Sequence, residues 1–106
     1  MHIEPTQPLS IAAGVLMPAT LASVRKSPSY HLQGWRILDR WAFESPAQLR
    51  ALEAEGEVIL LGRLLEQQQL EHHALRSTAA LELRRRGLAE QEILALHEIG
   101  TTLALA

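Results

Sequence analysis

The chain has 106 residues, a formal net charge of −2 at neutral pH and no cysteine. This length fits one domain, and the small net charge gives the chain as a whole no electrostatic attraction to nucleic acid or acidic lipid. The absence of cysteine excludes disulfides, thiolate zinc sites and a cysteine nucleophile, and it fits the reducing cytoplasm, where we expect the protein to act. Because aromatic residues make up only 4% of the chain and rarely adjoin β-branched ones, we predict a single all-α domain over residues 1–106.

The N-terminal quarter is mostly uncharged and apolar. Residues 1–8 contain two prolines, so we expect a loose segment there. The run Leu9–Val24 has no charged residue, which would also suit a signal peptide or a transmembrane helix. A signal peptide begins with basic residues, and a membrane span needs about 20 uninterrupted apolar residues. Because Pro18 interrupts this shorter run, we predict two buried helical pieces, at 10–17 and 18–26, and no membrane association.

Two tryptophans mark the next segment, which we predict to be a short helix over residues 31–44. Trp35, Leu38 and Trp41 recur there at helical spacing. Tryptophan is enriched in binding hot spots, so Trp35 and Trp41 could anchor a partner protein. They could also pack in the core against the helix that follows, and the sequence leaves both interpretations open.

Residues 45–87 are typical of one long helix. A Ser-Pro pair gives its start, because serine caps free backbone N–H groups and proline suits the first helical position. At its end, the arginines 84–86 would compensate the helix dipole, and Gly87 would supply a left-handed turn followed by an apolar Leu88. Gly56 is the expected site of a break within this helix.

This long helix has two apolar stripes when its residues are placed about 100° apart. The first stripe consists of Leu61, Leu64, Leu65, Leu75, Ala79 and Leu83. The second consists of Leu49, Leu52, Ile59, Leu60, Leu70, Ala74 and Leu81. A helix that lies on a surface needs only one apolar face, so two stripes place this helix inside a bundle or between two chains. We predict a small helical bundle of four or five helices organised around this one long central helix.

Polar residues interrupt the first stripe. Gln68 and His72 lie between Leu65 and Leu75. A polar residue in an apolar seam lowers stability but can fix the register and the choice of partner in helix pairs. We therefore predict a protein partner and a homodimer formed through apolar helix faces. The residues expected at this interface are Trp35, Trp41, Leu61, Leu65, Gln68, His72 and Leu75.

The chain ends in a short helix and an apolar tail. The helix is expected from Ala89 to about His97, with Glu90 and Glu92 at its positive end. The tail at 101–106 is uncharged, and we expect it to extend the helix or to dock on a neighbour, because an exposed apolar end is a liability.

No residue pattern in the chain is typical of an enzyme. His72 and His73 would point about 100° apart on a helix, so they would not chelate one ion. His97-Glu98 begins like a zinc-protease motif, but Thr101 stands where that motif needs its second histidine. There is no catalytic-triad order and no phosphate-binding glycine loop. We therefore predict a non-enzymatic protein with no catalytic residues, no metal, no cofactor and no small-molecule substrate.

A cluster of arginines suggests an alternative function. It consists of Arg76, Arg84, Arg85 and Arg86. As a DNA-binding regulator, the chain would place these arginines on phosphates and the following helix on the bases. That helix is acidic and apolar, with Glu90 and Glu92 in its first turn, which argues against base reading.

Overall fold

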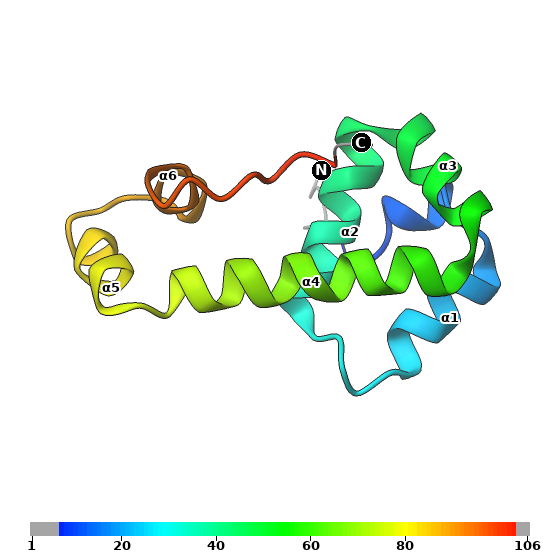
Figure 1. Cartoon of the computed structure of the whole chain (residues 1–106), viewed down its shortest axis with the longest axis horizontal. Helices are drawn as coiled ribbons and strands as arrows, with labels where there is room; N and C mark the ends of the chain where they lie inside the picture. Colours follow the sequence, from blue (N-terminus) through cyan, green and yellow to red (C-terminus); the bar gives the residue numbers. More distant parts are fainter. Residues whose placement is uncertain (1–6, 104–106) are drawn as a thin grey trace, which may run out of the picture.

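Six α-helices and one short 3₁₀ helix make up the computed structural model, which describes residues 7–103 (Figure 1). In chain order these are η1 (Ala12–Gly14), α1 (Pro18–Lys26), α2 (Leu32–Glu44), α3 (Pro46–Glu55), α4 (Glu57–Leu75), α5 (Thr78–Arg85) and α6 (Glu90–Leu96). The described residues contain no strand, so the all-α prediction is confirmed. Most of the predicted loose segment, and the end of the tail at 104–106, lie outside the described residues.

The first two α-helices form where the sequence predicts them. α1 has Pro18 in its first turn and Arg25 and Lys26 in its last turn. The piece expected at 10–17 is wrong, since only the 3₁₀ turn η1 forms there. The carboxylate of Asp39, on α2, accepts hydrogen bonds from the backbone N–H groups of Leu9 (2.7 Å) and Ala12 (2.8 Å), which fixes this segment as a tight turn.

The long helix predicted between residues 46 and 86 is divided into three helices, α3, α4 and α5, where one break was expected. The break at Gly56 was expected, and its φ of 142° is one that other residues rarely adopt. A second break follows α4, at Arg76 and Ser77. The Ser77 hydroxyl accepts a hydrogen bond from Ala80 N (3.1 Å) and so starts α5 as a new helix. The described residues therefore form six α-helices, of which α4 is the longest, and the predicted bundle of four or five helices around one long central helix is not confirmed.

The end of α5 follows the predicted left-handed turn. Gly87 has a φ of 95°. Its N–H donates to Arg84 O (2.9 Å), and Leu88 N–H donates to Leu83 O (3.1 Å), which completes a Schellman motif. This turn reverses the chain and sends α6 back beside α5 (Figure 1).

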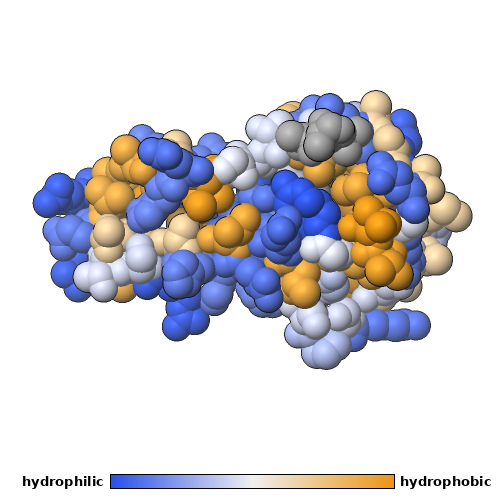
Figure 2. Space-filling view, in the orientation of Figure 1, coloured by the Kyte–Doolittle hydropathy of each residue, from blue (hydrophilic) through white to orange (hydrophobic). Residues whose placement is uncertain are grey.

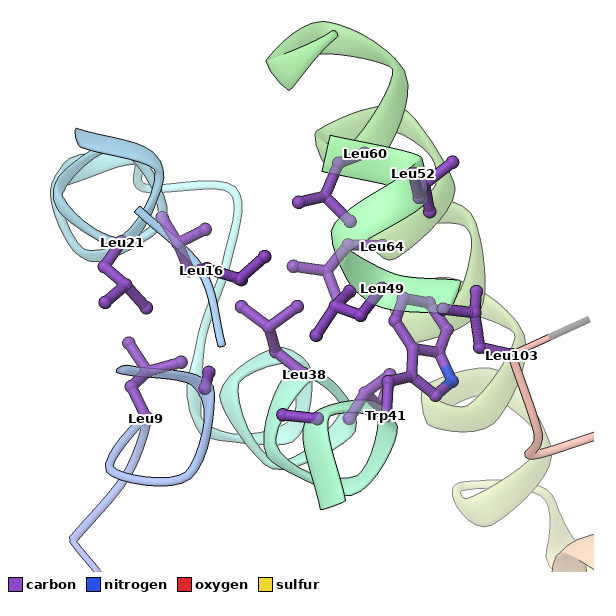
Figure 3. Close-up of a cluster of buried hydrophobic side chains, with 14 of the residues drawn as sticks. Leu9, Leu16, Leu21, Leu38, Trp41, Leu49, Leu52, Leu60, Leu64 and Leu103 are labelled. Carbon is purple, nitrogen blue, oxygen red and sulfur yellow. The ribbon is translucent and has the colours of Figure 1, made fainter. Parts of the chain in front are cut away.

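Two hydrophobic clusters lie along α4. The larger one gathers side chains from η1, α1, α2, α3 and the first half of α4, with Leu38 and Trp41 of α2 facing Leu60 and Leu64 of α4 (Figure 3). The smaller one consists of Ala74, Leu75, Ala80, Ile93 and Leu94. The segment after α6 returns toward α2, and Leu103 is buried in the larger cluster near Trp41 (Figures 1 and 3). α4 is therefore the element that both clusters share.

Replacing Gly34 by alanine should destabilise the fold. A Cβ on Gly34 would clash with Gln68 Oε1. Gln68 is buried and bonds both His31 N–H (3.2 Å) and Ser29 O (2.9 Å), so it cannot move without breaking these bonds. We expect Gly34→Ala to lower the free energy of unfolding by about 1–3 kcal/mol in urea denaturation, despite the better helix propensity of alanine.

Gly62→Ala is the matched control, because no atom lies within 4 Å of a Cβ at this helical glycine. It should raise the free energy of unfolding by about 0.5–1 kcal/mol. Equal effects of the two substitutions would contradict close packing at Gly34.

Tyr30, the one tyrosine of the chain, should make stability sensitive to alkaline pH. Its hydroxyl donates to Leu61 O (2.6 Å), and burial raises the pKa of the phenol above its ordinary value of 10.0. Because the folded-state pKa is the higher one, this contribution is fully present below about pH 10 and is lost as the pH rises through the folded-state pKa. Phenolate absorbance in the folded chain should therefore appear at higher pH than in urea, and Tyr30→Phe should flatten the alkaline loss of stability.

Candidate interaction surface

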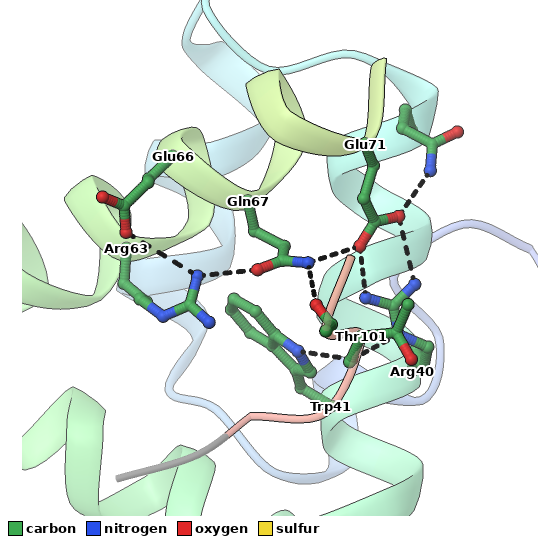
Figure 4. A network of polar contacts seen from close by, with 9 residues as sticks. Arg40, Trp41, Arg63, Glu66, Gln67, Glu71 and Thr101 are labelled. Atoms are coloured by element: carbon green, nitrogen blue, oxygen red, sulfur yellow. Dashed lines mark hydrogen bonds and ion pairs between the residues drawn. The ribbon is translucent and has the colours of Figure 1, made fainter. Parts of the chain in front are cut away.

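The inner side of α4 carries a buried carboxylate. Glu71 is 0% exposed, and the Arg40 guanidinium donates to both of its oxygens, at 2.6 and 3.3 Å. Gln67 Nε2 (2.7 Å) and Gln33 Nε2 (3.0 Å) donate to the same carboxylate (Figure 4). A buried charge is tolerated only when it is paired and hydrogen-bonded, and here both oxygens have two donors.

The same network binds the segment that follows α6. Gln67 Nε2 also donates to Gly100 O (2.7 Å). Arg40 Nε (2.9 Å) and Trp41 Nε1 (3.3 Å) donate to Thr101 O. The backbone of this segment is therefore tied to α2 and α4 by side chains of both helices (Figure 4).

Sequence reasoning missed the buried roles of Gln67 and Glu71. The signal was present, because Glu71 follows Leu64 by seven residues and precedes Leu75 by four, which places it on the same helix face. Gln68, which the sequence placed in an apolar seam, is buried as well. It bonds backbone groups of its own chain, at Ser29 and His31.

Apolar side chains also remain exposed on a flank of α4, roughly 100–120° around the helix from Glu71. We call this side the outer face of α4, and it consists of Ile59, Arg63, Glu66, Leu70 and His73. Ile59 is 51% exposed and Leu70 is 49% exposed. Both belong to the second predicted stripe, which is therefore not closed within one chain.

A groove of about 440 Å³ runs beside the second half of this face. Leu70, Ala74 and Ile99 give it apolar surface, and Glu66, Gln69 and His73 add polar groups. The groove lies between α4 and the segment that follows α6. Apolar side chains gather over this end of the molecule and over the start of α4 (Figure 2). Helical peptides and apolar side chains of partner proteins commonly occupy grooves of this kind.

The residues predicted for the interface are spread over different environments. Trp41, Gln68 and Leu75 are buried, whereas Trp35, Leu61 and Leu65 are half-buried against the larger cluster. The indole N–H of Trp35 is buried with no acceptor among the described residues. His72 is exposed, and its ring makes an edge contact with that of His31 at 5.3 Å between centroids. The structure does not bring these seven side chains together on one accessible surface.

The arginine cluster lies beside acidic side chains. Arg84 pairs with Glu90 (3.2 Å), and both Arg85 (3.7 Å) and Arg86 (3.5 Å) approach Glu82. Arg76 lies apart from them, with its guanidinium 3.3 Å from a ring nitrogen of His72. The positive charge of the cluster is therefore partly compensated within the chain.

Residues 7–103 contain no group of three or more histidine and acidic side chains placed to hold a metal ion. Within the same range, no helix combines the length and the apolar character that crossing a membrane requires. No family model, curated protein or solved structure matches the chain. Function is therefore inferred from the side chains alone.

Glu71→Gln should destabilise the protein strongly. The amide would place a donor against the donors of Arg40 and Gln67, and it would leave the mostly buried Arg40 without its counter-charge. We expect a loss of about 3 kcal/mol in the free energy of unfolding, measured by urea denaturation. Glu66→Gln on the same helix is the control, since the Glu66 side chain is 70% exposed and its loss should cost less than about 0.5 kcal/mol. Similar losses for both would show that the buried pair does not stabilise the fold.

Proposed function

We propose that this chain is a non-enzymatic protein that binds other proteins, and associates with itself, through apolar helix faces. Its principal binding surface is the outer face of α4 together with the adjoining groove. The proposal requires no metal, cofactor or small-molecule substrate, and it is compatible with a cytoplasmic setting.

One observation carries this proposal. In the second half of α4 the polar residues Gln67, Gln68 and Glu71 are buried beside Ala74 and Leu75, while the apolar Leu70 remains about half exposed. A helix of a self-sufficient domain normally has the reverse arrangement, with its apolar side inward. Leu70 also adjoins a groove whose other side includes Ile99, so the exposed apolar surface is concave and continuous. Such a surface is typical of a protein-binding site.

Nucleic-acid binding by the arginine cluster has less support. Three of its arginines already lie near Glu82 or Glu90, and a phosphate would compete with these carboxylates. If the chain did bind DNA through them, affinity would fall steeply as salt rises. A gel-shift with a salt titration separates this alternative from binding through the outer face of α4.

Leu70→Glu should abolish partner binding while leaving the fold intact. The substitution places a charge at the centre of the apolar surface, where a partner would have to desolvate it. Capture from a lysate of the native host, with wild type and variant immobilised side by side, should show loss of the proteins retained by wild type. Circular dichroism should show the same helix content in both chains.

Leu81→Glu is the matched control, because Leu81 is also a helical leucine with 49% of its surface exposed but lies on α5, away from the groove. It should retain the captured proteins. If both variants lose them equally, or neither does, the outer face of α4 is not the binding surface.

A further inference from the structure

The geometry points to a second copy of this chain as the occupant of the outer face of α4. The two α4 helices pack antiparallel, and Ile59 of each copy inserts beside Leu70 of the other. This inference rests on the proposed function, because it names the partner of the surface described there.

The spacing of the outer face is that of a helix-pairing seam. Its residues, Ile59, Arg63, Glu66, Leu70 and His73, follow one another at intervals of four, three, four and three. This alternation is the pattern of core positions where two helices pack side by side. α2, α3, α5 and α6 all contact α4, yet Ile59 and Leu70 remain about half exposed, so a further helix can reach them.

The groove has the form that such packing requires. In knobs-into-holes packing, one side chain enters a hole made by residues i, i+3, i+4 and i+7 of the facing helix. Glu66, Gln69, Leu70 and His73 have this spacing, and all four line the groove. An apolar side chain fits such a hole, and Ile59 of the second copy, half exposed and three turns earlier on α4, supplies one.

A twofold axis that crosses α4 between residues 64 and 65 aligns the seams of the two copies and brings Ile59 of each copy to the groove of the other. It places Ile59 opposite Leu70 of the second copy, and Leu70 opposite the second copy's Ile59. Between these two apolar layers, Arg63 lies opposite Glu66 of the second copy, and the same pair recurs on the other side of the axis. Every layer from 59 to 70 is then an apolar contact or an opposite-charge pair.

The charges also select the antiparallel direction. In a parallel pair, Arg63 would face Arg63 and Glu66 would face Glu66, and such like-charge layers disfavour association. Arg63 is ordered before the second copy arrives, since it donates to Gln67 Oε1 (2.9 Å), lies over the Trp41 ring at 5.1 Å and approaches Glu66 of its own chain at 4.0 Å. A partner carboxylate therefore meets a guanidinium that loses little further freedom on binding.

The contact between the two helices is small for a dimer interface. A helix of 19 residues is about 28 Å long and about 10 Å wide. A seam of that size buries less than the roughly 1,200 Å² typical of stable complexes. We therefore expect a reversible dimer with a dissociation constant in the micromolar range.

Sedimentation velocity over a concentration series tests the association. The wild type should pass from a monomer of 11.8 kDa to a dimer as concentration rises through the micromolar range. Leu70→Glu, and Glu66→Arg, which would set arginine against Arg63 of the second copy, should each raise the dissociation constant at least about tenfold. Leu81→Glu should leave it within about twofold.

Cysteine cross-linking tests the direction and register, and the natural absence of cysteine leaves no background. A mixture of one chain with Ile59→Cys and a tagged chain with Leu70→Cys should form a disulfide-linked heterodimer under mild oxidation. Neither chain should cross-link to itself, because in the antiparallel pair two copies of position 59 lie about 16 Å apart along the helix, beyond the roughly 7 Å between Cα atoms that a disulfide can span. A mixture of Ile59→Cys with Leu81→Cys should also remain unlinked.

The outcomes separate this inference from the proposed function. Self-linking of the Ile59→Cys chain without the mixed product would overturn the antiparallel register. A chain that stays monomeric at all concentrations and forms no cross-link would overturn the homodimer. If that monomer still captured another protein in a Leu70-dependent manner, the binding of other proteins in the proposed function would stand, and its self-association would be contradicted. If the chain neither dimerised nor captured another protein through Leu70, both the homodimer and the proposed function would be contradicted.

Discussion

The carboxylate of Glu71, buried and paired with Arg40, determines how the other parts of this molecule are arranged. An ion pair out of water costs desolvation free energy that its attraction only partly offsets, but removing one partner leaves an uncompensated buried charge and is strongly destabilising. Glu71 lies on α4 between the two hydrophobic clusters. Its partners come from α2 and α4, and one of them, Gln67, also binds the backbone after α6. The network therefore joins α2, α4 and the segment after α6 by directional hydrogen bonds, several of them to charged groups.

This arrangement also explains why apolar surface remains outside. In the second half of α4, amide and carboxylate side chains occupy the inner side, so the apolar residues of that half are divided between the small cluster and the outer face. Leu70 therefore remains exposed to solvent. Ile59, eleven residues earlier on the same helix, is exposed to a similar extent. A chain of this size cannot bury every leucine, yet most exposed apolar residues in proteins are scattered. Here Ile59 and Leu70 share one flank of α4 and Leu70 lines a groove, whereas other exposed apolar residues, such as Phe43 and Leu96, are scattered over the surface.

Local signals in the sequence were sufficient to predict the helix boundaries that depend on single residues. Helix α1 begins at Pro18, and helices α3 and α5 end shortly before Gly56 and Gly87, as the backbone preferences of proline and glycine predict. The break at Ser77 was missed because leucine periodicity continues across it, although serine is a common N-cap. The turn at η1 was missed because its cause, Asp39, lies about thirty residues further on. For the candidate surface, the pattern identified the second stripe, but which of its leucines are exposed depends on the partners of Glu71, and these come from distant parts of the chain.

The buried network and the outer face of α4 are physically continuous. Gln67 donates from its amide nitrogen to Glu71 and accepts from Arg63 through its amide oxygen. The bonds therefore run from the buried carboxylate through the helix to a guanidinium at the seam. An interface residue positioned in this way loses less conformational entropy on association than a free surface arginine would. The polar interior that leaves Leu70 exposed thus also orders the charge beside it, so one set of contacts determines both the fold and the geometry of the surface that a partner would meet.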